Sequence, residues 1–270
     1  MTNAIGRGGR MKIAIYANEY DESIQAKEEL VNKLLQESFE IEHVSPEIVV
    51  TIGGDGTVLD AIHHYLDKID TVKFIGIHTG HLGYYTDWLP HEIDELIEFI
   101  KGDELSVEQY PLLQVNLCAN NECQKLYALN EMTILNAKRT QHLDITINEL
   151  FFESFRGTGL CISTPTGSTA YNKSLGGALL YPEIEAFQMT EIASINNNVY
   201  RTIGSPLIIP KGQSLSIQSE NWENITLTQD HLNIPTESIS RIEITLSDKS
   251  AKFIKREEAL FWKRIKQHFL

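Results

Sequence analysis

The stretch from Pro46 to Thr57 constrains the fold more than any other, because it joins an apolar run to a helical pattern through a glycine-rich turn. Residues 48–52 are apolar or β-branched, which is typical of a buried strand. Residues 53–57 are Gly-Gly-Asp-Gly-Thr, and apolar residues at helical spacing follow from Val58 onward. A strand, a tight turn and a helix in this order form the repeating unit of an α/β sheet. The first part of the chain is therefore predicted to be an α/β domain.

The same turn has the properties of a phosphate-binding loop. Glycines allow an anion to approach the backbone closely, and the start of a helix offers free N–H groups and a positive dipole end. Asp55 would repel phosphate unless it binds a metal or accepts a proton from an attacking hydroxyl group. The alternative is that Asp55 or Thr57 only caps the helix and the glycines only make the turn. The loop lacks the Lys-Ser/Thr ending of a Walker A sequence and the full G-x-G-x-x-G pattern, so it is a phosphate loop of another kind or none.

Strands and helices alternate through the first 109 residues, which predicts a parallel sheet. Ligands of such sheets bind at the carboxyl ends of the strands, where residues 53–57 and a second glycine-rich turn, residues 78–85, both fall. His78 and His81 in the second turn have a spacing that permits metal binding, but ordinary loop histidines are the favoured interpretation. The predicted strands are 12–17, 48–52 and 72–77, and the predicted helices are 21–39, the segment after 57, and 90–101.

From Tyr110 the chain offers short strands at close spacing, which predicts an antiparallel β domain such as a sandwich. Asn120-Asn121 predicts a hairpin between the first two strands, and a mostly helical insertion is expected before residue 207. Residues 257–270 form an amphipathic helix with Phe261, Trp262, Ile265 and Phe269 on one side, expected to dock on the protein rather than on a membrane. The predicted strands are 112–118, 124–129, 132–135, 143–147, 150–155, 207–209, 215–217, 225–227 and 239–246, and the predicted domains are 1–109, 110–250 and a tail, 251–270.

Charge and cysteine content exclude several classes of protein. The net charge of −14 argues against non-specific binding to nucleic acid, which depends on Lys and Arg. It does not argue against a nucleotide, whose charge amides and a divalent cation can neutralise. Three cysteines, an odd number, do not suggest a disulfide framework, and without a C-x-x-C pair a structural zinc is not expected. No apolar run reaches the length of a membrane span and residues 1–10 do not resemble a secretory signal, so a cytoplasmic protein is expected.

A second dense stretch, residues 156–177, also suits a nucleotide. A strand at 160–163 ends in a turn of Thr, Pro, Gly and Ser, which opens a helix capped by Ser168 or Thr169. Tyr171 can stack on a base, and Asn172 and Ser174 offer hydrogen bonds; the alternative is a plain Ser/Thr-rich turn. Two polar pairs elsewhere, Asn130-Glu131 and Asp230-His231, either bind sugar hydroxyls or form solvated turns.

Taken together, these stretches resemble the bacterial NAD kinase family. The similarity runs in order from residue 46 to 210 and reaches the Phe-Trp-Lys-Arg sequence of the tail. The first motif is shared with lipid kinases and phosphofructokinases, whereas the whole set is highly specific. The matching segments are residues 53–57, 78–84, 129–131, 163–172, 193–197, 200–207 and 261–264.

The resemblance implies a Rossmann-like α/β domain and a C-terminal antiparallel β-sandwich domain that meet at a cleft holding NAD. ATP or polyphosphate would give its terminal phosphoryl group to the 2′-hydroxyl of the adenosine ribose with the help of Mg or Mn. Asp55 would be the catalytic base. Members are dimers or tetramers, so Tyr200 would reach the NAD site of a neighbouring subunit, and the chain would be a homo-oligomer, with a homotetramer expected.

The resemblance also assigns binding residues by position. Donor phosphates would lie on Gly53, Gly54, Gly56 and Thr57, and the ribose on Asn130 and Glu131. The other positions expected to bind nucleotide are Tyr84, Arg156, Thr158, Thr166, Thr169, Ala170, Tyr171, Asn172, Lys173, Ser174, Ala193, Tyr200 and His231.

Two positions depart from the family pattern. Thr158 stands where members usually have Asp between two glycines, which keeps a hydrogen-bonding group but removes a charge, so contact with the nicotinamide side and NAD affinity are expected to differ. Thr166 replaces a common Ser and keeps the hydroxyl. Two other functions fit parts of the sequence. A lipid or sugar kinase would leave residues 163–172 without a dinucleotide to bind, and a non-catalytic NAD-binding regulator would not need Asp55.

Overall fold

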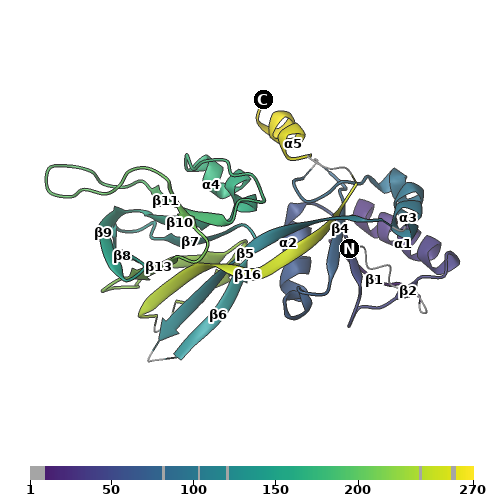
Figure 1. Ribbon diagram of the computed structural model, residues 1–270, viewed down its shortest axis with the longest axis horizontal. Coiled ribbons are helices and arrows are strands. Elements are labelled where there is room, and N and C mark those ends of the chain that lie inside the picture. Colours follow the sequence, from purple (N-terminus) through teal and green to yellow (C-terminus); the bar gives the residue numbers. More distant parts are fainter. Residues whose placement is uncertain (1–9, 81–82, 103, 120–121, 237–238, 257–259) are drawn as a thin grey trace. The chain divides into compact units, whose positions relative to one another are not determined.

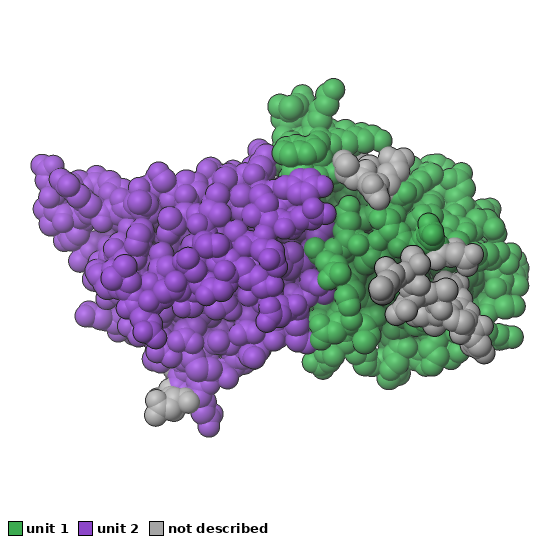
Figure 2. All heavy atoms as spheres, in the orientation of Figure 1, with its two compact units in different colours: residues 1–109, 251–270 green, residues 110–250 purple. Residues whose placement is uncertain are grey.

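The computed structural model describes residues 10–80, 83–102, 104–119, 122–236, 239–256 and 260–270. The chain divides into two compact units (Figure 2). The first contains residues 1–109 together with 251–270, and the second contains residues 110–250. Long strand β16 (Arg241–Lys255) contributes residues to both units, because the division falls at residue 251.

The first unit contains a parallel sheet in the order β2-β1-β3-β4, with the end of β16 pairing in parallel beside β4 (Figure 1). The parallel α/β domain expected from the alternating pattern is thereby confirmed. Its strands are β1 (Lys12–Ala17), β2 (Glu40–Ile41), β3 (Ile48–Ile52) and β4 (Lys73–Ile77). Its helices are α1 (Asp21–Gln36), α2 (Asp55–His64), α3 (Ile93–Lys101) and α5 (Leu260–Phe269), with short 3-10 turns η1 (Leu66–Lys68) and η2 (Pro90–Glu92).

Helices α1 and α3 bury their apolar stripes in one core with the β strands. Leu30 and Leu34 of α1 and Leu96 of α3 are fully buried against strand residues such as Ile13 and Val50. Side chains at i and i+4 of a helix share one face, so the Leu30–Leu34 pair fixes which side of α1 meets the sheet. The polar outer face predicted for residues 21–39 follows from the same periodicity.

The register of the sheet brings both glycine-rich turns to one edge. Ile52 of β3 is paired with Ile77 of β4, and these are the last residues of their strands. The backbone N–H of Gly53 then donates to the carbonyl of Ile77 over 2.9 Å. The turn at 53–57 and the turn that begins at His78 therefore lie side by side.

The second unit is a β sandwich, as expected. One sheet contains β13, β8 and β9, with β5, β6 and the first part of β16; the other has the order β12-β11-β10-β7-β14-β15 and is antiparallel throughout. Apolar side chains from both sheets form one core. The strands are β5 (Ser106–Ala119), β6 (Glu122–Ala128), β7 (Glu131–Leu135), β8 (Gln141–Ile147), β9 (Leu150–Gly157), β10 (Gly159–Ser163), β11 (Ala186–Ile192), β12 (Leu207–Pro210), β13 (Ser214–Gln218), β14 (Thr226–Gln229) and β15 (Leu232–Ile234).

The mostly helical insertion predicted before residue 207 is wrong. It holds two single-turn helices, η3 (Thr166–Thr169) and α4 (Tyr171–Ser174), and then strand β11, which pairs with β10 and β12. The alternation Phe187-Gln188-Met189-Thr190 indicates this strand, with Phe187 and Met189 in the apolar core and the polar Gln188 and Thr190 also buried. The predicted hairpin turn at Asn120-Asn121 lies outside the described residues, although β5 and β6 pair on either side of it.

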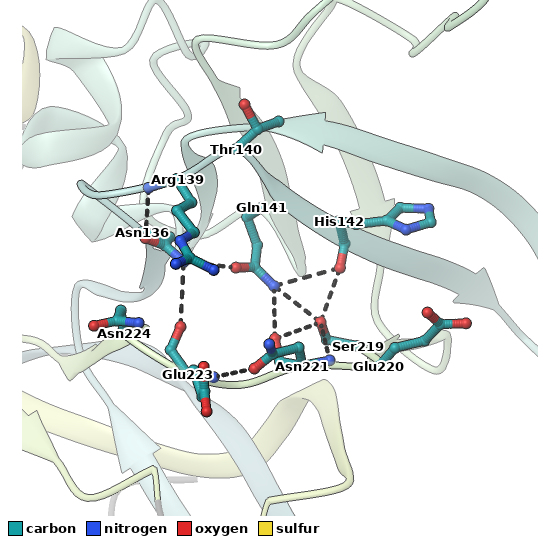
Figure 3. Close-up of a pocket in the computed structure, with 10 residues that line it drawn as sticks. All are labelled: Asn136, Arg139, Thr140, Gln141, His142, Ser219, Glu220, Asn221, Glu223 and Asn224. Atoms are coloured by element: carbon teal, nitrogen blue, oxygen red, sulfur yellow. Dashed lines mark hydrogen bonds between the residues drawn. The ribbon is translucent and has the colours of Figure 1, made fainter.

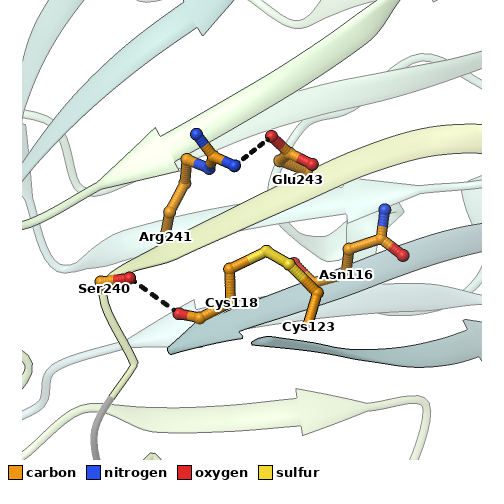
Figure 4. The surroundings of a disulfide bond; sticks show 6 residues. All are labelled: Asn116, Cys118, Cys123, Ser240, Arg241 and Glu243. Atoms are coloured by element: carbon orange, nitrogen blue, oxygen red, sulfur yellow. Dashed lines mark hydrogen bonds and ion pairs between the residues drawn. A yellow bond between two sulfur atoms is a disulfide. The ribbon is translucent and has the colours of Figure 1, made fainter. Parts of the chain in front are cut away.

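A disulfide joins Cys118 of β5 to Cys123 of β6 (Figure 4). The odd number of cysteines gave no reason to expect it; the two residues meet because they are direct cross-strand partners, with Cα atoms 4.1 Å apart. Ser240 donates from its hydroxyl to the carbonyl of Cys118 over 2.9 Å. The third cysteine, Cys161, is buried and free, and burial raises the pKa of its thiol. Among the described helices, none is long and apolar enough to cross a membrane.

Candidate active site

Asp55 is the first residue of α2 and its carboxylate faces a neighbouring segment of the same unit. One oxygen accepts the backbone N–H of Tyr84 over 2.8 Å, and the other accepts that of Tyr85 over 3.1 Å. The N-cap position of α2 is occupied by Gly54, so the carboxylate of Asp55 is not its capping group. The side chain is half-buried. Each carboxylate oxygen has a second lone pair, so Asp55 can still accept a proton or a hydrogen bond from a ligand.

The loop around Asp55 has the conformation that its glycines permit. Gly53 has φ of +151°, and a Cβ atom there would lie 2.2 Å from Oγ1 of Thr57. Side-chain amide Nδ2 of Asn18 donates to the same Thr57 oxygen over 3.3 Å, which ties β1 to the loop. Gly54 and Gly56, in contrast, have open space where a Cβ would be. The backbone of the loop is thus exposed at the positions that the phosphate interpretation requires.

Segment 83–88 closes on this carboxylate from the other glycine-rich turn. A Cβ atom on Gly83 would lie 2.1 Å from Oδ1 of Asp55, so only glycine permits this approach. The ring of Tyr84 stacks on that of His268, with centroids 4.9 Å apart. Burial raises the pKa of the Tyr84 phenol to about 12, and the nearby Asp55 charge acts in the same direction. His78 is buried and its ring nitrogen Nδ1 lies 3.2 Å from the carbonyl of Gly80, whereas His81 lies outside the described residues.

The donors around the loop decide what kind of metal site it can form. Among the described residues, no three His, Cys, Asp or Glu side chains gather as a metal cage. Mg²⁺ is commonly held by one or two carboxylates together with substrate phosphates and water. A single half-buried carboxylate, that of Asp55, beside an open glycine loop fits that mode of binding.

Asn130 and Glu131, at the start of β7, are organised by a residue 100 positions away. The carboxylate of Asp230 accepts the backbone N–H groups of Leu129, Asn130 and Glu131 at 3.0, 2.7 and 3.2 Å. Asp230 itself has φ of +52°, and its N–H donates to the carbonyl of Glu131 over 2.8 Å. Its neighbour His231 is exposed on the turn between β14 and β15. Asp230 therefore lies directly beside the backbone of the pair Asn130-Glu131.

Glu131 is a buried carboxyl group whose ionisation is unfavourable. Its side chain is 8% exposed, and its Oε2 atom has no hydrogen-bond partner among the described residues. Burial raises the pKa of Glu131 to about 8, and the negative charge of Asp230 adds to this effect. A buried carboxyl with one unpaired oxygen is suited to receive a hydroxyl of a ligand.

The turn at 164–169 docks on the backbone of residues 129 and 130. Thr164 donates from its N–H to the carbonyl of Asn130 over 2.9 Å, and Thr166 donates from its hydroxyl to the carbonyl of Leu129 over 3.2 Å. A Cβ on Gly167 would lie 2.0 Å from the carbonyl oxygen of Asn130, so the contact depends on glycine. Two regions predicted separately from the sequence are thus adjacent in the second unit.

The remaining predicted residues of this region differ in exposure. Tyr171 is 41% exposed, Ser174 is exposed, and Ala170 and Lys173 are half-buried. Thr169 is buried and donates to the carbonyl of Thr166. Asn172 is fully buried: its Oδ1 accepts the hydroxyl of Thr190 over 2.7 Å, and a Cβ on Gly177 would collide with its amide. The amide oxygen of Asn172 is thus satisfied within the protein, whereas its Nδ2 atom has no hydrogen-bond partner among the described residues.

Four predicted residues meet at the end of β9. The guanidinium carbon of Arg156 lies 3.9 Å from the ring centroid of Tyr200, a cation–π contact within one chain. The N–H of Ile195 donates to the carbonyl of Arg156, and that of Thr158 donates to Ile192. Ala193 has φ of +47° and is exposed. Thr158 is half-buried beside them.

A separate polar cavity lies among the loops at 136–142 and 219–224 (Figure 3). Its volume is about 150 Å³, and none of the predicted site residues lines it. Gln141 donates to Oγ of Ser219 over 2.9 Å and to the carbonyl of Asn221 over 3.2 Å, while Asn136 donates to Gln141 over 3.1 Å. These groups bind one another across the loops, so their arrangement is explained by loop structure.

Three contributors to these sites were not predicted: Asp230, Gly83 and Arg264. For Asp230, as part of the pair Asp230-His231, the sequence left sugar binding and a solvated turn both open, and Gly83 was only one of several glycines. Arg264 lies in the tail, and its guanidinium donates to the carbonyl of Thr86 over 3.1 Å. The position of Asp230 next to the predicted ligand His231 was the available clue for Asp230. Gly83 and Arg264 act through contacts that sequence spacing does not reveal.

Solved structures define the class of fold. The chain is similar to the crystal structure of yeast NADH kinase complexed with NADH, with a TM-score of 0.84 and 18% identity over 97% of this chain and 88% of that one. It is also similar to an NAD kinase from Archaeoglobus fulgidus in complex with ATP, with a TM-score of 0.71 and 24% identity over 96% of this chain and 97% of that one. The fold is thus one used by dinucleotide kinases.

Sequence comparisons identify the family. The model of the ATP-NAD kinase N-terminal domain matches residues 15–104, and that of the C-terminal domain matches residues 129–256. NAD kinase of Latilactobacillus sakei is 42% identical over 96% of this chain and 98% of its own length. NAD kinase 1 of Listeria innocua is 47% identical over 86% of this chain and 88% of its own. The chain belongs to the NAD kinase family.

Proposed function

We propose that this enzyme transfers the terminal phosphoryl group of ATP to the 2′-hydroxyl of the adenosine ribose of NAD, giving NADP. The observation that carries the proposal is the Asp55 carboxylate, held by two backbone amides beside an open glycine loop at the strand ends. Membership of the family supports the same reaction, because both halves of the chain match. Polyphosphate is a second donor to be tested, since the loop binds phosphates rather than a base.

Asp55 acts as the base that orients and deprotonates the ribose hydroxyl. A bond forms between the 2′-oxygen and the terminal phosphorus while the bond from that phosphorus to the bridging oxygen of ADP breaks, and the proton passes to Asp55. Such transfer has a loose transition state, so positioning and charge neutralisation supply most of the catalysis. The two amide bonds from Tyr84 and Tyr85 hold the carboxylate in one orientation for this purpose.

The loop from Gly53 to Thr57 binds the donor phosphates through its amides and through the positive end of α2. The open positions at Gly54 and Gly56 leave its backbone accessible. A divalent cation, Mg or Mn, would be held by the donor phosphates and Asp55, and would supply charge neutralisation when bound. Asn18 keeps the loop in register through Thr57.

The second unit binds NAD. Asn130 and Glu131 receive the ribose hydroxyls, which supplies a partner for the buried Oε2 atom of Glu131. Tyr171, which is partly exposed, stacks on the adenine, with Thr166, Thr169 and Ala170 forming the adjacent wall. Arg156, Thr158, Lys173, Ser174, Ala193 and His231 bind the remainder of the dinucleotide, and Tyr200 is contributed to this site by a neighbouring subunit. In the first unit, Tyr84 binds nucleotide beside Asp55.

We also propose that the enzyme works as a homo-oligomer. Strand β9 ends its sheet and exposes Leu150 and Phe151, 71% and 60% accessible. An exposed apolar edge strand favours pairing with another chain. Val199, next to Tyr200, is 77% exposed as well. A second copy of the chain would cover this surface and bring Tyr200 to the NAD site of its neighbour.

One assay tests the reaction. The purified chain is incubated with ATP, magnesium and NAD, and NADP is measured with an NADP-specific dehydrogenase; polyphosphate replaces ATP in a parallel reaction. Formation of NADP is expected. A lipid or sugar kinase would consume ATP only with its own acceptor, and a non-catalytic regulator would bind NAD in calorimetry without forming NADP.

A further inference from the structure

Helix α5 carries a buried arginine onto the segment that holds Asp55. Arg264 is 5% exposed, although its neighbour Trp262 is 62% exposed and Lys263 is exposed too. The prediction that Trp262 packs with the inner side of this helix is wrong, because the polar Arg264 occupies the most buried described position instead. A buried guanidinium is unfavourable unless it is paired and hydrogen-bonded.

The partners of Arg264 are Thr86 and Asp87. The guanidinium donates to the carbonyl of Thr86 over 3.1 Å and forms a close ion pair with the carboxylate of Asp87. Asp87 also lies 3.5 Å from the ammonium group of Lys255, at the end of β16. Arginine can donate hydrogen bonds to a carbonyl and to a carboxylate at the same time, because its N–H groups are arranged as a rigid fork.

The residues clamped by Arg264 directly follow the two that bind the carboxylate of Asp55. Tyr84 and Tyr85 donate their N–H groups to Asp55, and Thr86 and Asp87 come next in the chain. Beyond them, the N–H of Asp87 donates to the carbonyl of Gly76 over 3.0 Å, which attaches the segment to β4. A backbone shift at residue 86 would therefore be transmitted to the amides at 84 and 85.

This cluster combines two cations with three carboxylates. Lys255 and Arg264 supply the positive charges, Asp55 and Asp87 supply two negative ones, and Glu108 acts on Lys255 as a third. Burial lowers the pKa of both cations, to about 8 for Lys255 and about 10 for Arg264, while Asp55 is among the groups that raise each of them. Glu108 acts on Lys255, and Tyr84 and Tyr85 act on Arg264, in the same direction.

We propose that Arg264 is a positioning residue for the phosphoryl transfer: it fixes the backbone of residues 84–87 so that two amides orient the carboxylate of Asp55. The C-terminal helix is thereby a structural part of the catalytic apparatus. The stacking of His268 on Tyr84 attaches the same helix to the same segment. This inference rests on the role proposed for Asp55.

The first experiment compares Arg264→Ala with Lys263→Ala, a change at the exposed neighbouring position of the same helix. We expect Arg264→Ala to lower kcat about tenfold to a hundredfold, because small misplacements of reacting groups have effects of this size, while KM for NAD changes less than about twofold. Methylguanidinium added to Arg264→Ala should restore part of kcat. Lys263→Ala should match the wild type. A normal kcat, or a loss confined to KM, would overturn the proposal.

The second experiment asks whether Arg264 acts through Asp55. Arg264→Ala is introduced into the Asp55→Asn variant, and the residual turnover of both is measured well below their melting temperatures. We expect no further loss, because the carboxylate to be positioned is already gone. An additional loss as large as in the wild-type background would contradict the proposal.

Two provisions keep the test decisive. If Arg264→Ala does not fold, Arg264→Lys keeps the charge beside Asp87 but lacks the fork of donors, so its kcat should still fall; wild-type kcat in that variant would contradict the proposal. If the wild-type enzyme itself forms no NADP, the proposed function has failed rather than the role of Arg264.

Discussion

At the level of single side chains, Asp55 is expected to affect turnover far more than binding. Asp55→Asn keeps the size of the side chain but removes its capacity to accept a proton, and its NH₂ group cannot accept an amide N–H. We predict that kcat falls by about 10²–10⁴-fold, the range for general base catalysis, with the dissociation constant of NAD nearly unchanged by calorimetry. Asp60→Asn, an exposed position of the same helix, is the matched control. Equal losses in turnover and in binding would refute the role.

Glu131 makes a second prediction, for the effect of pH on stability. Its pKa is about 8 in the folded protein and near its ordinary value of 4.5 when unfolded. The stability that its neutral form contributes is therefore complete below about pH 4.5 and is lost as the pH rises toward 8. Glu131→Gln has no proton to lose. We expect the variant to gain unfolding free energy relative to the wild type between pH 5 and pH 8, on the order of 1 kcal/mol or more, in denaturant titrations.

The wild type and variant should be compared at constant ionic strength, because salt alters surface charge effects over the same pH range. Glu122→Gln, on exposed strand β6, is a suitable control and should leave the pH slope unchanged. A Glu131→Gln variant whose stability relative to the wild type is the same at pH 5 and pH 8 would show that the buried carboxyl does not titrate in this window.

At the level of secondary structure elements, the sequence predicted those strands, turns and helices that depend on residues close together in the chain. Strand β3, its glycine turn and α2 follow from a run of β-branched residues and from glycines that permit a tight turn. Strand β11 was not predicted, because its alternating pattern, Phe187-Gln188-Met189-Thr190, is only four residues long. The bonds from Asp230 to residues 129–131 and from Arg264 to Thr86 join positions about 100 and 178 apart, and only the folded chain shows such contacts.

The β5–β6 hairpin gives a prediction for one element. Its disulfide closes a loop of only about six residues, so the chain-entropy model gives it a stabilisation of no more than about 2 kcal/mol. The double variant Cys118→Ser, Cys123→Ser should therefore fold, because the ladder from Leu113 to Ala119 remains paired with β6. Thermal unfolding with and without dithiothreitol measures the effect on the wild type, and the reductant should not affect the double variant. Loss of the folded state on reduction would contradict this expectation.

For the whole molecule, the expectation of an α/β domain followed by an antiparallel β domain is confirmed, because alternation of helices with strands and close spacing of strands are properties of long segments. How copies of the chain assemble is not encoded in such patterns. It depends on which apolar side chains stay exposed after folding, and that is known only once β9 is placed at the end of its sheet.

The exposed edge at β9 therefore yields the prediction for assembly. Phe151→Asp places a charge on a surface that a second copy is proposed to cover, and burying an unpaired charge is strongly unfavourable. We expect light scattering after size-exclusion chromatography to show an oligomer for the wild type and a smaller species for the variant. NAD affinity should fall with the mass, because the neighbour would no longer supply Tyr200. Val44→Asp adds the same charge at a 71% exposed apolar position of the first unit and should change neither quantity. A wild type that is already monomeric, or a variant of unchanged mass, would mean that β9 is simply an exposed edge.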